Sequence, residues 1–194
     1  VEGTVTKITS VNIIGNEVFD TETLLKQFKL QPTNWRPFQR SDRYSKQQLM
    51  GDLEGLTSFY QDRGYLRFSV SGVQVQLTPD KKSIYITINV EEGEVYTIED
   101  RRFSGETILN ALFLDALTTT RAGQTFSRRE ATESANRIEV ALSDVGYAFA
   151  EVTPIPEIDE ETRRVTLNYF IEPGKRAYVR RIQFTGNSGT NDET

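Results

Sequence analysis

The chain has 194 residues with a formal net charge of −5, and it contains neither Cys nor His. The acidic balance disfavours nucleic acid as a partner, because non-specific binding depends on Lys and Arg side chains that neutralise phosphates. The missing His and Cys remove the commonest general base, the commonest metal ligands and any disulfide, so we predict no catalytic, metal or cofactor site.

The first elements are predicted by an alternating segment and a short helical pattern. Residues 8–16 alternate and end in Gly-Asn, which predicts a strand. Asp20 or Thr21 is suited to cap a helix that runs to about Phe28, and Phe19 is placed to pack back onto that helix.

A second, longer helix follows. Ser45, with Gln48 three residues later, forms a capping box, and Gly64 supplies the left-handed residue that closes a helix. Between them the apolar residues recur at helical spacing: Leu49, Leu53, Leu56 and Tyr60.

Two strands come next and form a hairpin around residues 78–82. In residues 68–77 the apolar parity changes from even at Val70 to odd at Val73, which implies an extra residue near residues 71–72. The final strand alternates cleanly, with apolar residues at Ile84, Ile86, Ile88 and Val90. One face of this strand is therefore predicted to lie in a core.

The same series then returns, which marks a tandem repeat. Residues 62–65 (Asp-Arg-Gly-Tyr) return as residues 144–147 (Asp-Val-Gly-Tyr), and Ser127 with Glu130 repeats the capping box. The remaining landmarks are the helical stripe Ala131, Ala135, Ile138 and Leu142, and the strand positions Val165, Leu167, Tyr169 and Ile171. The first unit is longer, and we place its insertion at residues 31–38.

The predicted fold is α+β, with the order strand, helix, helix, strand, strand in each unit. If two antiparallel helices cover one face, the third strand is the central one of a three-stranded mixed sheet and the second strand lies at an edge. We predict units at residues 1–94 and 95–175, with residues 176–194 as the truncated first strand of a following unit. The N-terminus has neither the basic nor the apolar region of a signal peptide, so we expect a piece of a longer chain.

The two predicted edge strands differ. The second unit carries Pro154 and Pro156 followed by acidic residues, which interrupt hydrogen bonding, whereas residues 68–77 contain no Pro and no charge. We predict a protein-docking edge on the first unit, with backbone pairing and side-chain contacts from Val73, Gln74, Val75, Gln76 and Leu77. In the alternative reading, the side chains of Val73, Val75 and Leu77 face the helices and belong to the core.

Other signals are weaker. Trp35 and Phe38 in the inserted loop are either an exposed contact or ordinary packing. The acidic runs at residues 91–92 and 159–161 are expected to be solvated, and the Arg pairs 101–102, 128–129, 163–164 and 180–181 are interpreted as solvated faces or module-to-module contacts.

Several stretches resemble the POTRA repeats of the BamA family of outer-membrane barrel assembly proteins. Residues 44–54, 60–68 and 74–82 are similar to the third repeat of that family, and residues 146–148 and 156–158 to the fourth. Residues 177–187 resemble the first strand of the fifth repeat. Glu106 stands where the repeat pattern has Asn after its glycine, which puts that turn in doubt.

This resemblance implies the periplasmic portion of a Gram-negative outer-membrane protein whose C-terminal barrel is absent from this fragment. It also implies docking of a BamB-like lipoprotein and other assembly subunits, with residues 74–77 matching the family's docking edge. Unfolded outer-membrane proteins would be guided by β-augmentation.

Alternatives remain at this stage. POTRA repeats also occur in polypeptide-secretion transporters and cell-division proteins, and a non-POTRA binding module is a further possibility. An RNA-binding module is disfavoured by the missing Gly-x-x-Gly loop between the helices. An enzyme would require a carboxylate dyad formed by folding.

Overall fold

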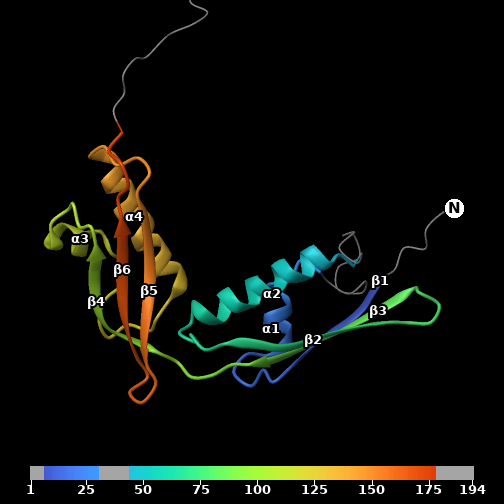
Figure 1. Cartoon of the computed structure of the whole chain (residues 1–194). Helices are drawn as coiled ribbons and strands as arrows, with labels where there is room; N and C mark the ends of the chain where they lie inside the picture. The colour runs from blue at the N-terminus through green and yellow to red at the C-terminus, as the bar shows by residue number, and fades with distance from the viewer. Residues whose placement is uncertain (1–6, 31–43, 178–194) are drawn as a thin grey trace, which may run out of the picture.

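The computed structural model describes residues 7–30 and 44–177, which form two successive modules (Figure 1). Module 1 consists of β1 (Lys7–Ile14), α1 (Thr21–Leu25), α2 (Lys46–Gln61), β2 (Ser69–Leu77) and β3 (Ser83–Glu91). Module 2 consists of β4 (Thr97–Gly105), α3 (Ala111–Leu117), α4 (Arg128–Asp144), β5 (Glu151–Asp159) and β6 (Arg164–Glu172). No helix in these described ranges is long and apolar enough to cross a membrane.

Each module has one three-stranded mixed sheet with its helices on one face (Figure 1). The strand orders are β1-β3-β2 and β4-β6-β5, so the last strand of each module is central. It pairs parallel to the first strand and antiparallel to the second. The predicted fold class, with its order of elements and its central third strand, is confirmed.

Alternation along the central strands produces the two cores. The apolar residues at every second position of β3 and β6 are buried, as are the stripes of α2 and α4 that pack on them. Burying a Leu, Ile or Val side chain contributes about 1.5–3 kcal/mol each. In module 1 the core is aromatic near the end of α2, where Tyr60 stacks on Phe68 and meets Phe19 edge to face.

Both predicted capping boxes begin a helix. Ser45 and Ser127 are the N-caps of α2 and α4, and their hydroxyls accept from the N–H groups of Gln48 and Glu130. Gly64, which follows α2, has φ of +93°, and Gly146, which follows α4, has φ of +101°. These left-handed residues turn the chain back toward the sheet.

The turn after the first strand is the same in both modules. A Cβ on Gly15 would lie 2.2 Å from the carbonyl oxygen of Val90, and one on Gly105 would lie 2.3 Å from that of Ile171. Only glycine permits so close an approach at positive φ. The substitution at Glu106 does not disturb this turn, because its N–H donates to the Ile171 carbonyl.

The first helix is shorter than predicted, since α1 ends at Leu25 rather than near Phe28. After Leu25 the N–H groups of Gln27 and Phe28 donate to carbonyls three residues back, so the chain tightens into a turn. The next two N–H groups, of Lys29 and Leu30, donate to the buried Asp52 carboxylate on α2. This anchor lies 22 to 23 residues further along the chain, so local periodicity cannot reveal it.

Hydrogen bonds and an apolar contact join the modules. The Tyr96 N–H donates to the Gly64 carbonyl at 2.9 Å, and the Tyr96 carbonyl accepts from Phe126 at 2.9 Å. Asp62 accepts from the Arg129 N–H in the first turn of α4 at 2.8 Å, and Leu66 packs against the core of module 2. We call these contacts the joint.

Exposed charges surround the joint. Arg67 pairs with Glu160, Arg163 pairs with Glu94 at 3.1 Å, and Arg128 donates to Gln61. The Arg pairs 128–129 and 163–164 thus contribute module-to-module contacts, as the sequence suggested for some of them.

Candidate functional site

The second strand of module 1, β2, lies at the edge of its sheet with backbone groups directed away from β3. Thr78, just after β2, donates its N–H inward to the Ser83 carbonyl at 3.0 Å. Because antiparallel residues alternate between inward and outward pairing, the N–H and C=O groups of Val73, Val75 and Leu77 point to the open edge. The ladder shifts register between Val70 and Gly72, so the predicted extra residue is confirmed.

The side chains of the same three residues lie on the helix-covered face without being buried. Their partners across the ladder are Ile88, Ile86 and Ile84, which belong to the core. Val73, Val75 and Leu77 nevertheless remain 37%, 40% and 51% exposed. These side chains therefore face the helix side, as in the alternative reading, but the helices leave them partly exposed, and the docking role stays a prediction.

The flank of α2 beside β2 adds another apolar side chain. In module 2, Glu139 of α4 reaches the edge strand β5, and the repeat aligns this position with Thr57 of α2. Met50 lies two helical turns before Thr57 and therefore on the same flank. Met50 is 62% exposed, so it adds apolar surface to this flank of α2.

The edge strand of module 2, β5, offers almost no outward donors. The Val152 N–H is taken by the Glu139 carboxylate at 2.8 Å, which shows that this parity of β5 faces outward. Pro154 and Pro156 have the same parity and lack an N–H. Leu66 of module 1 lines a hollow with both prolines. The edge of β5 thus offers few donors for strand addition, whereas no strand of the described residues pairs with the outer edge of β2.

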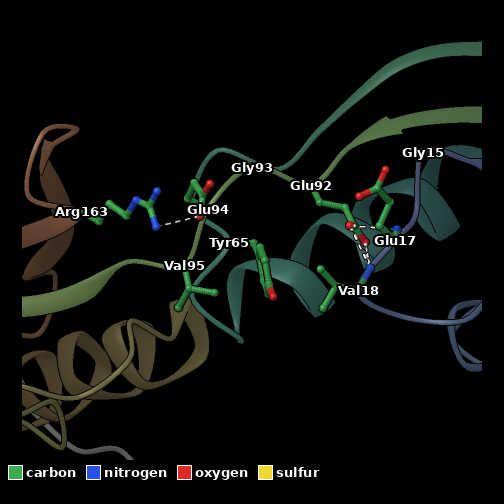
Figure 2. A pocket seen from close by; sticks show the side chains of 9 residues that line it. All are labelled: Gly15, Glu17, Val18, Tyr65, Glu92, Gly93, Glu94, Val95 and Arg163. Atoms are coloured by element: carbon green, nitrogen blue, oxygen red, sulfur yellow. Dashed lines mark hydrogen bonds and ion pairs between the residues drawn. The ribbon is translucent and has the colours of Figure 1, made fainter.

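A pocket of about 440 Å³ next to the joint contains a buried carboxylate (Figure 2). Glu92 accepts from the N–H groups of Glu17 and Val18 at 2.9 and 3.0 Å, and from the Tyr60 hydroxyl at 2.6 Å. Burial and this hydrogen bond raise the pKa of Tyr60 well above its usual value. Across the pocket, Arg163 pairs with Glu94.

The expectation that both residues of the acidic run 91–92 are solvated is wrong for Glu92. Glu91 is exposed, but Glu92 continues the parity of Ile88 and Val90 and so points to the covered face. That parity was the signal available in the sequence. With three donors on it, the Glu92 carboxylate fastens the loop after β1 to α2 and β3, which is a structural role.

The other candidate residues behave differently. Trp35 and Phe38 lie outside the described residues, as does almost all of the predicted strand at 176–194. Asp159 accepts from the N–H groups of Glu161 and Thr162 in the β5–β6 turn, so that run is exposed as expected. Within the described ranges, no three acidic side chains gather so as to hold a metal ion.

Two β-α-α-β-β modules in tandem, each with a three-stranded mixed sheet, define an α+β repeat protein. The POTRA family model, described as "Surface antigen variable number repeat", matches residues 6–93 and 96–174. The chain therefore belongs to the POTRA family.

Its relatives include assembly factors of the outer membrane. The chain is 35% identical to "Outer membrane protein assembly factor BamA" of Buchnera aphidicola over 98% of this chain and 31% of the relative. It is 32% identical to the BamA of Neisseria meningitidis over 99% of this chain and 24% of the relative. The chain thus spans about a third or less of these proteins.

A solved structure agrees with the sequence comparison. The crystal structure of Haemophilus influenzae BamA POTRA3-5 matches with a TM-score of 0.77 and 28% identity, over 96% of this chain and 74% of that one. BamA of Haemophilus ducreyi lacking POTRA domains 1-3 matches at 0.66 with 21% identity, over 86% of this chain and 29% of that one, and shares the fold. The resemblance to BamA repeats inferred from the sequence is confirmed.

Proposed function

We propose that this chain is a periplasmic protein-docking segment of an outer-membrane β-barrel assembly protein, and that β2 is its docking edge. The observation that carries the proposal is the contrast between two edges of the same fold. Three outward N–H groups lie on β2, whereas two of the three matching positions of β5 are prolines and the third, Ile158, keeps its N–H. Sheet edges are normally protected against pairing, so an open one favours a binding role.

Docking would proceed by β-augmentation. An extended segment of a partner pairs with the outward backbone groups of Val73, Val75 and Leu77, and each new hydrogen bond contributes about 0.5–1.5 kcal/mol. Apolar side chains of that segment, at every second position, contact Val75, Leu77 and Met50. Gln74 and Gln76 lie on the opposite, solvent face, where they add hydrogen-bonding groups at the rim.

The proposed partners are those that the resemblance to BamA implies. We infer that a BamB-like lipoprotein and other assembly subunits bind here, and that unfolded outer-membrane proteins use the same pairing chemistry on their way to the membrane. The parent protein would carry a C-terminal barrel in the outer membrane.

The test is calorimetric titration of the chain with the BamB-like lipoprotein of its own source. Val75→Pro removes one outward donor but no inward ladder bond, so we expect binding to be lost while the far-UV circular dichroism spectrum is retained. Val75→Ala is the matched control, because it removes the side chain and keeps the N–H. We expect it to retain most of the affinity, and Leu77→Lys to weaken binding by adding a charge to the apolar contact.

Equal binding by the wild type, Val75→Pro and Leu77→Lys would place the contact elsewhere. The loop with Trp35 or the joint would then be the next surface to examine. If Val75→Ala also lost binding, the binding free energy at this position would come from the side chain rather than from backbone pairing.

A further inference from the structure

A second surface, on module 2, is not explained by strand addition. A hollow of about 410 Å³ lies between the two helices of module 2, and we call it the α3–α4 groove. It is lined by Phe113, Leu117, Asn136, Arg137, Val140, Ala141 and Asp144. Phe113 is 46% exposed and Val140 62% exposed, so large apolar side chains from both helices face solvent. Contiguous apolar surface of this kind marks interaction sites.

In module 1, side chains cover the flank of α2 that corresponds to the groove side of α4. There the Arg63 guanidinium lies 3.6 Å from the centre of the Phe59 ring and donates to the Phe59 carbonyl. The repeat of residues 62–65 as 144–147 aligns Phe59 with Ala141 and Arg63 with Val145. Module 2 therefore lacks both the ring and the cation that cover this flank, and Val145 is itself exposed.

The walls of the groove determine what kind of segment fits. Both are helices, whose backbone groups are already paired within the helix, so an extended strand would gain no backbone hydrogen bonds here. A helix satisfies its own backbone and can present apolar side chains at intervals of three and four residues. The groove thus favours a helical occupant, unlike β2.

Charge specifies the occupant further. Arg137 and Asp144 lie at the rim of the groove, seven residues or two turns of α4 apart, which is about 10 Å along the helix. Neither side chain forms an ion pair or a hydrogen bond with another described residue. Opposite charges at the two ends favour one direction of a bound helix over the other.

We propose that the α3–α4 groove docks an amphipathic helix of a partner protein, with an acidic side chain opposite Arg137 and a basic one opposite Asp144. This goes beyond the docking role of β2, because it lies on the other module and takes a different secondary structure. The apolar face of the helix would contact Phe113, Leu117 and Val140.

The test uses two synthetic stapled helices of the same length and with the same apolar stripe. In one, a Glu and a Lys lie two turns apart beside the stripe, and in the other both of these positions are Glu. Binding to the full chain is followed by fluorescence anisotropy. We expect the Glu/Lys peptide to bind better, and Val140→Glu to weaken that binding about tenfold or more, as for a central contact. Asp144→Lys should reverse the preference between the two peptides, because two cations then face the bound helix.

Two variants separate this site from other effects. Ser58→Glu, at the matching position of α2, should leave binding unchanged, as should Val75→Pro on β2. The proposal is overturned if neither peptide binds, if Val140→Glu binds as the wild type does, or if Asp144→Lys fails to reverse the preference. It is also overturned if sedimentation shows self-association of the chain that Val140→Glu abolishes, because the occupant would then be a second copy.

Discussion

At the scale of single residues, two buried carboxylates each fix a loop of module 1 by accepting hydrogen bonds from its backbone. Asp52 accepts from two backbone N–H groups after α1, and Glu92 accepts from two N–H groups after β1 and from the Tyr60 hydroxyl. Module 2 uses hydroxyls at the corresponding helix position, where Ser134 accepts from the Thr119 N–H. A buried acceptor in each case replaces the water that the loop would otherwise bind.

Glu92→Gln should lower the free energy of unfolding by about 1–3 kcal/mol, because the amide offers one acceptor oxygen to donors that now meet two. The measurement is the midpoint of urea unfolding, compared between variants whose m-values are equal. Glu91→Gln is the matched control at the exposed neighbouring position and should change stability little. Equal effects of the two substitutions would contradict a structural role for the buried carboxylate.

Tyr60 makes the folding stability of module 1 fall at alkaline pH. Burial and the Glu92 hydrogen bond raise the pKa of Tyr60 in the folded chain, while the unfolded chain ionises near the ordinary tyrosine value of about 10. Stability from this group is therefore present below pH of about 10 and falls as the pH rises above it. The slope of unfolding free energy between pH 9 and 11 should be smaller in Tyr60→Phe than in the wild type. Tyr85→Phe, on the exposed face, should keep the wild-type slope, and an unchanged slope in Tyr60→Phe would refute the assignment.

Residue patterns that depend on neighbours in the chain were predictable. Both capping boxes, the closing glycines and the extra residue near Gly72 follow from local spacing and parity. The loop anchors were not predicted, because Glu92 contacts Glu17 and Val18 from 74 to 75 positions away and only folding brings them together.

At the scale of elements, β2 and β5 differ in the backbone donors at their outer edges, because β5 has prolines where β2 has N–H groups. The prolines of β5 were visible in the sequence, and so was the absence of Pro and charge on β2. The exposure of Val73, Val75 and Leu77 was not decidable, because it depends on how far α2 reaches across the sheet. The Glu139 bond to β5 also escaped prediction, since a lone Glu on a helix carries no signal of its partner.

Replacing both Pro154 and Pro156 with Val should open the edge of β5. Each substitution restores an outward N–H, so the strand can pair with another edge, and we expect self-association that increases with concentration. Sedimentation velocity measures it. Thr153→Val is the control, because it adds a β-branched residue at a position whose backbone faces inward. A double variant that stays monomeric wherever the control does would show that Leu66 and α4 protect this edge without the prolines.

At the scale of the whole molecule, the modules are connected by a repeated bond. The Gly64 carbonyl after α2 accepts from the Tyr96 N–H, and the Gly146 carbonyl after α4 accepts from the Ala177 N–H at 2.8 Å. In each module, the carbonyl of the glycine that closes the second helix thus accepts a hydrogen bond from the segment that follows the last strand. The relative placement of the modules was not predictable from the sequence, because it rests on contacts between residues far apart in the chain, such as the bond between Asp62 and Arg129.

Leu66 supplies an apolar contact in the joint, and exposed ion pairs surround the joint; the two kinds of contact should differ in importance. Exposed pairs contribute about 0–1 kcal/mol and are screened by salt, whereas Leu66 packs against the core of module 2. Because the chain has no Cys, Glu54→Cys on α2 and Glu157→Cys on β5 can carry spin labels cleanly. We expect a narrow distance distribution in the wild type, a broad one in Leu66→Ser, and little change in Arg163→Ala or at high salt. Broadening by Arg163→Ala or by salt, with Leu66→Ser unchanged, would mean that charge and not apolar packing holds the modules together.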